Sequence, residues 1–182
     1  MENWIIFGIL SVGIIFISWR TLLNIRSHGF YRFFGWELLL WLLVNNFKFW
    51  FSNPLSINQL MSWTLLLFSL YLLIAGILLM KEVGKPANTR ESKNLYQFEK
   101  TSRLIDSGVF RYIRHPLYAS LIYLTWGIFL KNPTIILLFV ALLASIFFYL
   151  TMLFDEKECI EYFGDEYREY MKCSKMFIPF IF

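Results

Sequence analysis

The sequence predicts an all-α integral membrane protein with about five transmembrane helices. Of its 182 residues, 58% are hydrophobic and 20% are aromatic, which is far too apolar for a soluble domain of this size. Several apolar runs reach the length that spans a bilayer. The basic residues gather in alternate connections between those runs, as they do in membrane proteins with a fixed orientation.

The apolar runs follow one another along a single predicted domain, residues 1–182. The second run is interrupted by Glu37, Asn45, Asn46 and Lys48, residues that we interpret as polar contacts between helices. Only Lys131-Asn132-Pro133 separates the fourth run from the fifth, so these two are expected to form a helical hairpin. The predicted spans are residues 4–20, 33–51, 60–80, 117–130 and 134–154.

The distribution of positive charge predicts the orientation. Lysines and arginines concentrate in residues 20–32, 81–114 and 157–175, whereas only Lys48 and Lys131 lie elsewhere. The rule that basic loops stay inside then places the N-terminus outside, with the loop 81–116 and the tail 155–182 in the cytoplasm. This asymmetry and anionic membrane lipids account for the net charge of +4 without nucleic acid as a partner.

The cysteines and histidines do not predict a metal site. Cys159 and Cys173 both lie in the predicted cytoplasmic tail, where thiols stay reduced, and their spacing matches no zinc motif. His28 and His115 belong to different segments of the chain. No metal is therefore expected.

The long polar loop changes character along its length. Residues 83–92 have the turn formers and charges of a solvated linker, whereas residues 96–105 mix aromatic, charged and aliphatic side chains, which favours an ordered segment. Further on, Pro116 favours an extended conformation at His115 and is well suited to begin the fourth helix. The start of that helix could attract a carboxylate. Alternatively, Arg114 anchors a lipid headgroup, His115 caps the helix and Tyr118 is an interfacial aromatic.

Two adjacent carboxylates, Asp155 and Glu156, follow the fifth run. Charges at this depth are costly, so they suggest a positively charged partner, although they could also begin an amphipathic helix in water. The apolar spacing of Ile160, Phe163, Tyr167 and Met171 predicts such a helix against the membrane face. We interpret most aromatic residues of this tail as packing residues.

The segment Gly108-Val-Phe-Arg-Tyr-Ile-Arg-His-Pro-Leu-Tyr118, together with Phe163-Gly-Asp-Glu-Tyr-Arg-Glu-Tyr170, resembles the isoprenylcysteine carboxyl methyltransferase family and the related phospholipid N-methyltransferases. The resemblance covers Leu104 to Pro179. It implies an integral-membrane enzyme that binds S-adenosyl-L-methionine without a Rossmann domain. The catalytic residues implied are Arg114, Asp155 and Glu156. The cofactor-binding residues implied are Ser102, Arg103, Leu104, Ile105, Phe110, His115, Pro116, Leu117, Tyr118, Asp155 and Glu156.

The chemistry of these residues suits that cofactor. Asp155 or Glu156 would pair with its ammonium group, while Arg114 and the helix start at Pro116 would favour its carboxylate. Aromatic faces can stabilise its sulfonium. Methyl transfer then needs alignment of donor and acceptor and exclusion of water, with no covalent nucleophile.

One departure from the family concerns the methyl acceptor. The carboxyl methyltransferases place an arginine four residues before the cofactor-binding acid, and Thr151 occupies that position here. We therefore expect a lipophilic acceptor other than a prenylcysteine carboxylate, such as a lipid amine, a thiol or another small apolar molecule that enters from the membrane. A carboxylate acceptor stays an alternative, since Arg103 or Arg114 could supply the missing charge from another direction. Alternative interpretations are a membrane reductase that uses a nicotinamide cofactor, or a non-enzymatic membrane scaffold subunit.

Overall fold

The computed structural model describes residues 2–84 and 101–179, and in these residues the protein is all-helical, with six α-helices and no strand. The α-helices are α1 (Glu2–Leu22), α2 (His28–Asn46), α3 (Ile57–Glu82), α4 (Pro116–Phe129), α5 (Ile135–Phe163) and α6 (Asp165–Cys173). Two short 3-10 helices, η1 (Phe47–Phe49) and η3 (Gly108–Arg111), lie in the connections.

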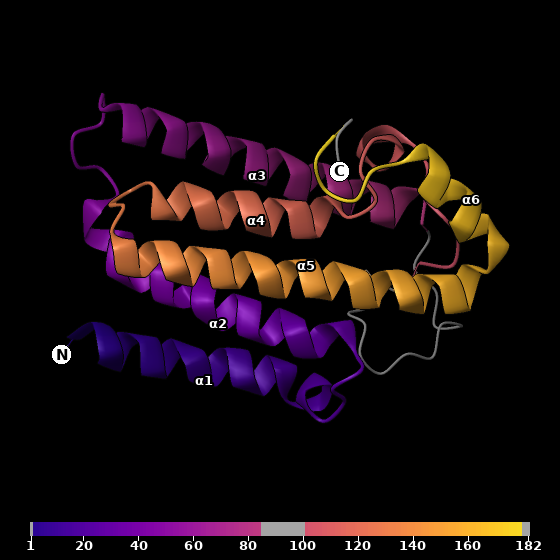
Figure 1. Cartoon of the computed structure of the whole chain (residues 1–182), viewed down its shortest axis with the longest axis horizontal. Coiled ribbons are helices and arrows are strands. Elements are labelled where there is room, and N and C mark those ends of the chain that lie inside the picture. Colours follow the sequence, from indigo (N-terminus) through magenta and orange to yellow (C-terminus); the bar gives the residue numbers. More distant parts are fainter. Residues whose placement is uncertain (1, 85–100, 180–182) are drawn as a thin grey trace.

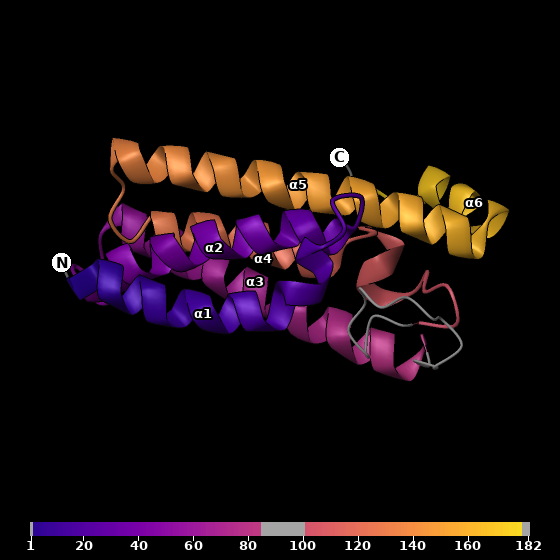
Figure 2. The same ribbon diagram turned by 90° about the horizontal axis from the view of Figure 1, so that it is seen from below.

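The first five α-helices form an antiparallel bundle (Figure 1). α4 packs between α3 and α5, and α2 packs against α5 on one side and α1 on the other. Figure 2 shows the bundle turned by 90°, with α6 folded back beside the end of α5. The described parts of the three basic segments therefore meet at one end of the bundle, which we call the site end. It contains the ends of α1, α3 and α5 and the beginnings of α2 and α4.

Three helices, α1, α3 and α5, are long and apolar enough to cross a membrane. Their large exposed side chains, such as Trp4, Phe16 and Leu67, suit contact with lipid. α4 is apolar but has only 14 residues, about 21 Å of helix against a hydrocarbon core of roughly 30 Å. The protein is therefore an integral membrane protein with three candidate spans, and spanning by α2 and α4 stays a prediction.

Two helices extend beyond the predicted spans by more than a turn at one end. α2 begins at His28 rather than residue 33, because the Ser27 side chain accepts a hydrogen bond from Gly29 N and caps the helix there. α5 continues to Phe163 instead of ending at residue 154. No helix breaker interrupts it until Gly164, whose φ of +63° favours glycine.

The length of α5 explains where its carboxylates lie. About twenty residues of helix cross a hydrocarbon core, so a span that begins at Ile135 reaches the interface near Phe154. Asp155 and Glu156 follow on the same rigid helix rather than in a separate tail. Ile160 and Phe163 also belong to α5, whereas Tyr167 and Met171 belong to α6.

Candidate functional site

The site end is organised by backbone pairing between the His-Pro segment and the C-terminal tail. Ile113 and Lys175 form an isolated parallel bridge, in which Arg114 N donates to Lys175 O at 2.7 Å. His115 N donates to Met176 O at 3.1 Å. His115 has φ −120° and ψ +60°, which lies outside the helical region without being fully extended, and α4 starts at Pro116, as the sequence predicts. The tail therefore holds the loop against the beginning of α4.

His115 is 4% exposed, and its ring faces the two carboxylates of α5. Its Nδ1 lies 3.3 Å from Asp155 Oδ2, and its Nε2 lies 3.4 Å from Glu156 Oε1. Burial alone lowers the pKa of His115, but the hydrogen bonds to Asp155 and Glu156 outweigh it and raise the pKa above its ordinary value. The imidazolium form is thus favoured between two carboxylates.

Arg114 is occupied by contacts within the protein. Its Nε donates to Glu156 Oε1 at 2.8 Å, and its Nη1 donates to the carbonyl oxygens of Met171 and Ser174. Both side chains of the Arg114–Glu156 pair are only 9% exposed. The two charges therefore neutralise each other and fix the tail to α5. This geometry favours a structural role for them over direct contact with a charged ligand.

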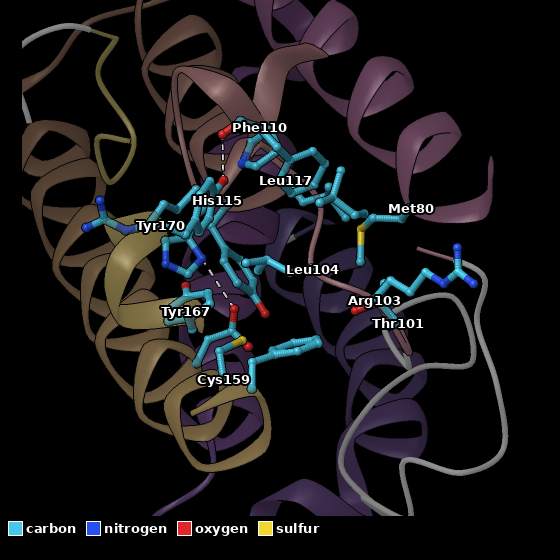
Figure 3. A pocket seen from close by; sticks show the side chains of 16 residues that line it. Met80, Thr101, Arg103, Leu104, Phe110, His115, Leu117, Cys159, Tyr167 and Tyr170 are labelled. Carbon is cyan, nitrogen blue, oxygen red and sulfur yellow. Dashed lines mark hydrogen bonds and ion pairs between the residues drawn. The ribbon is translucent and has the colours of Figure 1, made fainter. Parts of the chain in front are cut away.

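A cavity opens beside His115, where the loop before α4 meets α4, α5 and α6. Its wall includes every site residue predicted from the sequence except Ser102 and Glu156. Those in the wall are Arg103, Leu104, Ile105, Phe110, Arg114, His115, Pro116, Leu117, Tyr118 and Asp155. In Figure 3 the labelled side chains of the loop, α4 and α5 lie around the cavity, with Tyr167 and Tyr170 of α6 closing one side, whereas the guanidinium of Arg103 extends outwards.

Ser102 and Glu156 lie behind the wall. Ser102 donates from its backbone N to Gly84 O at 3.0 Å, which joins the end of α3 to the residues before η3. Glu156 is held by Arg114 and His115, as described above. The part of the expected ordered segment at residues 96–100 lies outside the described residues.

Six further wall residues were not predicted as ligands. They are Met80, Thr101, Cys159, Phe163, Tyr167 and Tyr170. Cys159 follows Asp155 by one helical turn, a spacing that could have placed it on the same face. The sequence predicts a packing role for Tyr167. In the structure the apolar face of α6 that carries Tyr167 also closes the cavity, so this residue both packs and lines the site.

The tyrosines of α6 remain neutral phenols. Tyr170 Oη donates to Phe110 O at 2.5 Å, and both tyrosines are buried. Burial raises the pKa of Tyr167 and of Tyr170 well above the ordinary value. The cavity wall thus combines one carboxylate, Asp155, with neutral aromatic rings.

A second polar group lies close behind this wall. His28, the first residue of α2, is fully buried, and Glu158 of α5 holds it twice. Glu158 Oε1 accepts from His28 N at 3.1 Å, and Oε2 lies 2.9 Å from His28 Nδ1. Asp155 offers an oxygen within 4.8 Å of the ligand atoms of His28 and Glu158. The sequence did not predict this pair, because nothing in the local pattern links residue 28 to residue 158.

The fold and the site define a membrane protein that is helical throughout its described residues, with a cavity at one end of its bundle. Residues 64–166, more than half of the chain, match the phospholipid methyltransferase family. The chain belongs to this family, whose members are membrane methyltransferases that use S-adenosyl-L-methionine. The finer resemblance to isoprenylcysteine carboxyl methyltransferases is not part of this match.

The chain is also similar to methanethiol S-methyltransferase 1 of Bradyrhizobium diazoefficiens. The two are 26% identical over 188 residues, which cover 98% of this chain and 54% of the relative. The chain thus spans about half the length of this curated relative. No solved structure matches the chain.

The residues of the cavity fit the family's cofactor. Asp155 offers a carboxylate for an ammonium group, and Arg103 offers a cation for a carboxylate. The rings of Phe110, Tyr118 and Phe163 offer apolar and π surfaces. When bound, S-adenosyl-L-methionine supplies an activated methyl group on a sulfonium.

Proposed function

We propose that this chain transfers a methyl group from S-adenosyl-L-methionine to a small apolar thiol, and that the cavity beside His115 holds the cofactor. The observation that carries the proposal is the meeting of Asp155, Arg103 and several aromatic rings in one cavity wall. These are the complements of an ammonium, a carboxylate and a sulfonium. Similarity to a protein named a methanethiol S-methyltransferase, over nearly the whole of this chain, supports a thiol as acceptor.

The protein residues would bind and orient rather than react. Asp155 pairs with the cofactor's ammonium, and His115 positions the Asp155 carboxylate through the 3.3 Å contact at Nδ1. Arg103 pairs with the cofactor's carboxylate. Phe163, Tyr167 and Tyr170 shield the reacting groups from water. The shape of the cavity would align the methyl donor with the acceptor.

Thr151 bears on the charge of the methyl acceptor. Its side chain is fully buried, and its Oγ1 donates to Phe147 O at 2.7 Å within α5. This position therefore brings no positive charge to the site, and an anionic acceptor would be costly without one. A neutral thiol avoids that cost, and a prenylcysteine carboxylate does not.

Two measurements test this proposal on the purified protein in lipid nanodiscs. Calorimetry with S-adenosyl-L-methionine, S-adenosylhomocysteine and NADPH should show binding of the first two alone. Incubation with labelled S-adenosyl-L-methionine should then transfer label to methanethiol in preference to a prenylcysteine analogue or a phospholipid extract. Preferred labelling of the prenylcysteine or the lipid would refute the acceptor class while leaving the cofactor site standing.

A further inference from the structure

We propose that His28, oriented by Glu158, accepts the proton of a small thiol as that thiol is methylated. This inference rests on the proposed function and narrows it to acceptors small enough to reach a buried histidine. A thiol is a weak nucleophile until it loses its proton, so a thiol methyltransferase gains from a base beside the acceptor.

The contacts of His28 determine which nitrogen of the neutral ring carries the proton. Both oxygens of Glu158 accept from the same residue, Oε1 from His28 N at 3.1 Å and Oε2 from Nδ1 at 2.9 Å. A carboxylate only accepts, so the neutral ring carries its proton on Nδ1 and presents the lone pair of Nε2. This is the arrangement by which an acidic residue orients a histidine base.

Nε2 of His28 is buried and has no hydrogen-bond partner among the residues that the structure describes. A buried polar atom without a partner costs free energy, so it needs an explanation. The residue is also fully enclosed, at 0% exposure. A ligand with an S–H or O–H group that reached Nε2 would donate the missing hydrogen bond to it.

His28 lies next to the cofactor cavity without forming part of its wall. The rings of His28 and Tyr118 have their centroids 6.5 Å apart, and Tyr118 lines the cavity. Asp155, also a wall residue, lies within the 4.8 Å group that His28 and Glu158 form. The proposed base is therefore one side chain away from the cavity assigned to the cofactor, close enough for a small thiol bound beside the cofactor to reach it.

The charges that face His28 come from two helices. Burial opposes the imidazolium and so does Arg32 of α2, but the hydrogen bond to Glu158 and the charge of Asp155, both of α5, outweigh them and raise the pKa of His28 above its ordinary value. Arg32 is buried with its guanidinium 5.1 Å from the centre of the Trp36 ring. The neutral form, which is present above that pKa, is the form that accepts the thiol proton.

The step balances as a simple displacement. The thiol sulfur forms a bond to the transferred methyl carbon. The bond from that carbon to the sulfonium sulfur breaks and leaves its electron pair on that sulfur. The thiol proton passes to Nε2 of His28, giving a thioether, S-adenosylhomocysteine and an imidazolium paired with Glu158.

The test compares two thiols and two variants. His28→Asn keeps a donor near the position of Nδ1 for Glu158 but has no base at Nε2, and Glu158→Gln removes the carboxylate. With methanethiol, both should lower kcat by about 10²-fold or more, the range of general-base catalysis. With thiophenol, which ionises near neutral pH without help, kcat should fall less than tenfold.

Glu161→Gln, an exposed change on the same helix, is the matched control and should leave both rates unchanged.

A second readout does not depend on turnover. With S-adenosylhomocysteine bound, thiophenol added below its solution pKa should show the ultraviolet absorption of the thiolate in the wild type and not in His28→Asn. Calorimetry should give the same S-adenosyl-L-methionine affinity for both.

The outcomes separate the claims. Equal losses with both thiols, or unchanged activity in His28→Asn, would overturn the role of His28 while the methyltransferase assignment stands. Inactivation by a chelator, with recovery on adding zinc, would overturn it in favour of a metal held by His28, Asp155 and Glu158. A wild type that binds S-adenosyl-L-methionine but methylates no thiol would refute the acceptor class and this inference with it.

Discussion

At the scale of single residues, the adjacent carboxylates Asp155 and Glu156 have different tasks. Asp155 is in the cavity wall, whereas Glu156 is held by Arg114 Nε at 2.8 Å. The sequence predicts a pair of acids for the cofactor's ammonium but cannot divide their roles, because neighbouring helical residues point about 100° apart and the partner, Arg114, comes from another segment. The difference leads to separate expectations for the two acids.

Asp155→Asn should weaken S-adenosyl-L-methionine binding by about 2–5 kcal/mol, since it removes a partly buried charge that faces the ligand. Glu156→Gln should lower the free energy of unfolding by about 1–3 kcal/mol, since Arg114 then lacks its partner. Calorimetry and thermal unfolding measure the two effects separately. Asp165→Asn, exposed at the start of α6, is the control for both. Unchanged affinity in folded Asp155→Asn would contradict the assignment of Asp155.

His115 should make the stability of the protein depend on pH. Its folded-state pKa is raised, so its stabilising contribution is complete below the unfolded pKa of about 6.5 and is lost as the pH rises through the folded value. Thermal unfolding of the wild type and of His115→Gln from about pH 6 to about pH 9 would measure this. The difference between the two midpoints should shrink as the pH rises. A difference that stays constant across this range would contradict a charged His115 in the folded protein.

At the scale of elements, the sequence predicts helix class and order well and helix ends less well. Apolar runs identify all five bundle helices, and Pro116 predicts the start of α4. The end of α5 was missed because apolarity stops at Phe154 while the helix does not. The residues after it, Asp155 to Phe163, are polar yet helical, and only Gly164 ends the helix. Hydropathy reports the solvent around a helix, not its length.

The far end of the bundle is fixed by Lys131 in the turn between α4 and α5. Its Nζ donates to Gln59 Oε1 of α3 at 2.9 Å and lies 3.7 Å from the centre of the Trp63 ring. Lys131→Met should therefore destabilise the protein by about 1–3 kcal/mol, because Gln59 loses a buried partner. The readout is the thermal midpoint, with activity per folded molecule unchanged, since the turn is distant from the cavity. A matched change at Lys48, in the connection at the same end, should have a smaller effect, and equal effects would contradict a specific role for Lys131.

At the scale of the whole molecule, the site is made of segments that are far apart in the chain. Residues 28, 80, 115, 158 and 170 come from different elements that meet only because the bundle folds antiparallel. The sequence predicts the His-Pro part of the site, because that motif is local. It misses His28 and the α6 tyrosines, because their positions depend on packing between helices. The predicted grouping of basic segments at one end is a property of the same antiparallel order.

That grouping also predicts which face of the membrane carries the site. The basic residues around the site end favour the cytoplasm, and the far end, with Lys48 and Lys131, then faces outside.

Cys173 is exposed in α6, so in a Cys159→Ser background it provides a single native thiol at the site end. A second protein, Cys159→Ser, Cys173→Ser and Leu55→Cys, provides a thiol at the far end, where Leu55 is 86% exposed. In intact cells, a membrane-impermeant maleimide should label the Leu55→Cys protein and should label Cys173 only after permeabilisation. Labelling of Cys173 in intact cells would reverse the orientation, and labelling of both would place the two ends of the bundle on the same side, against a spanning arrangement of its helices.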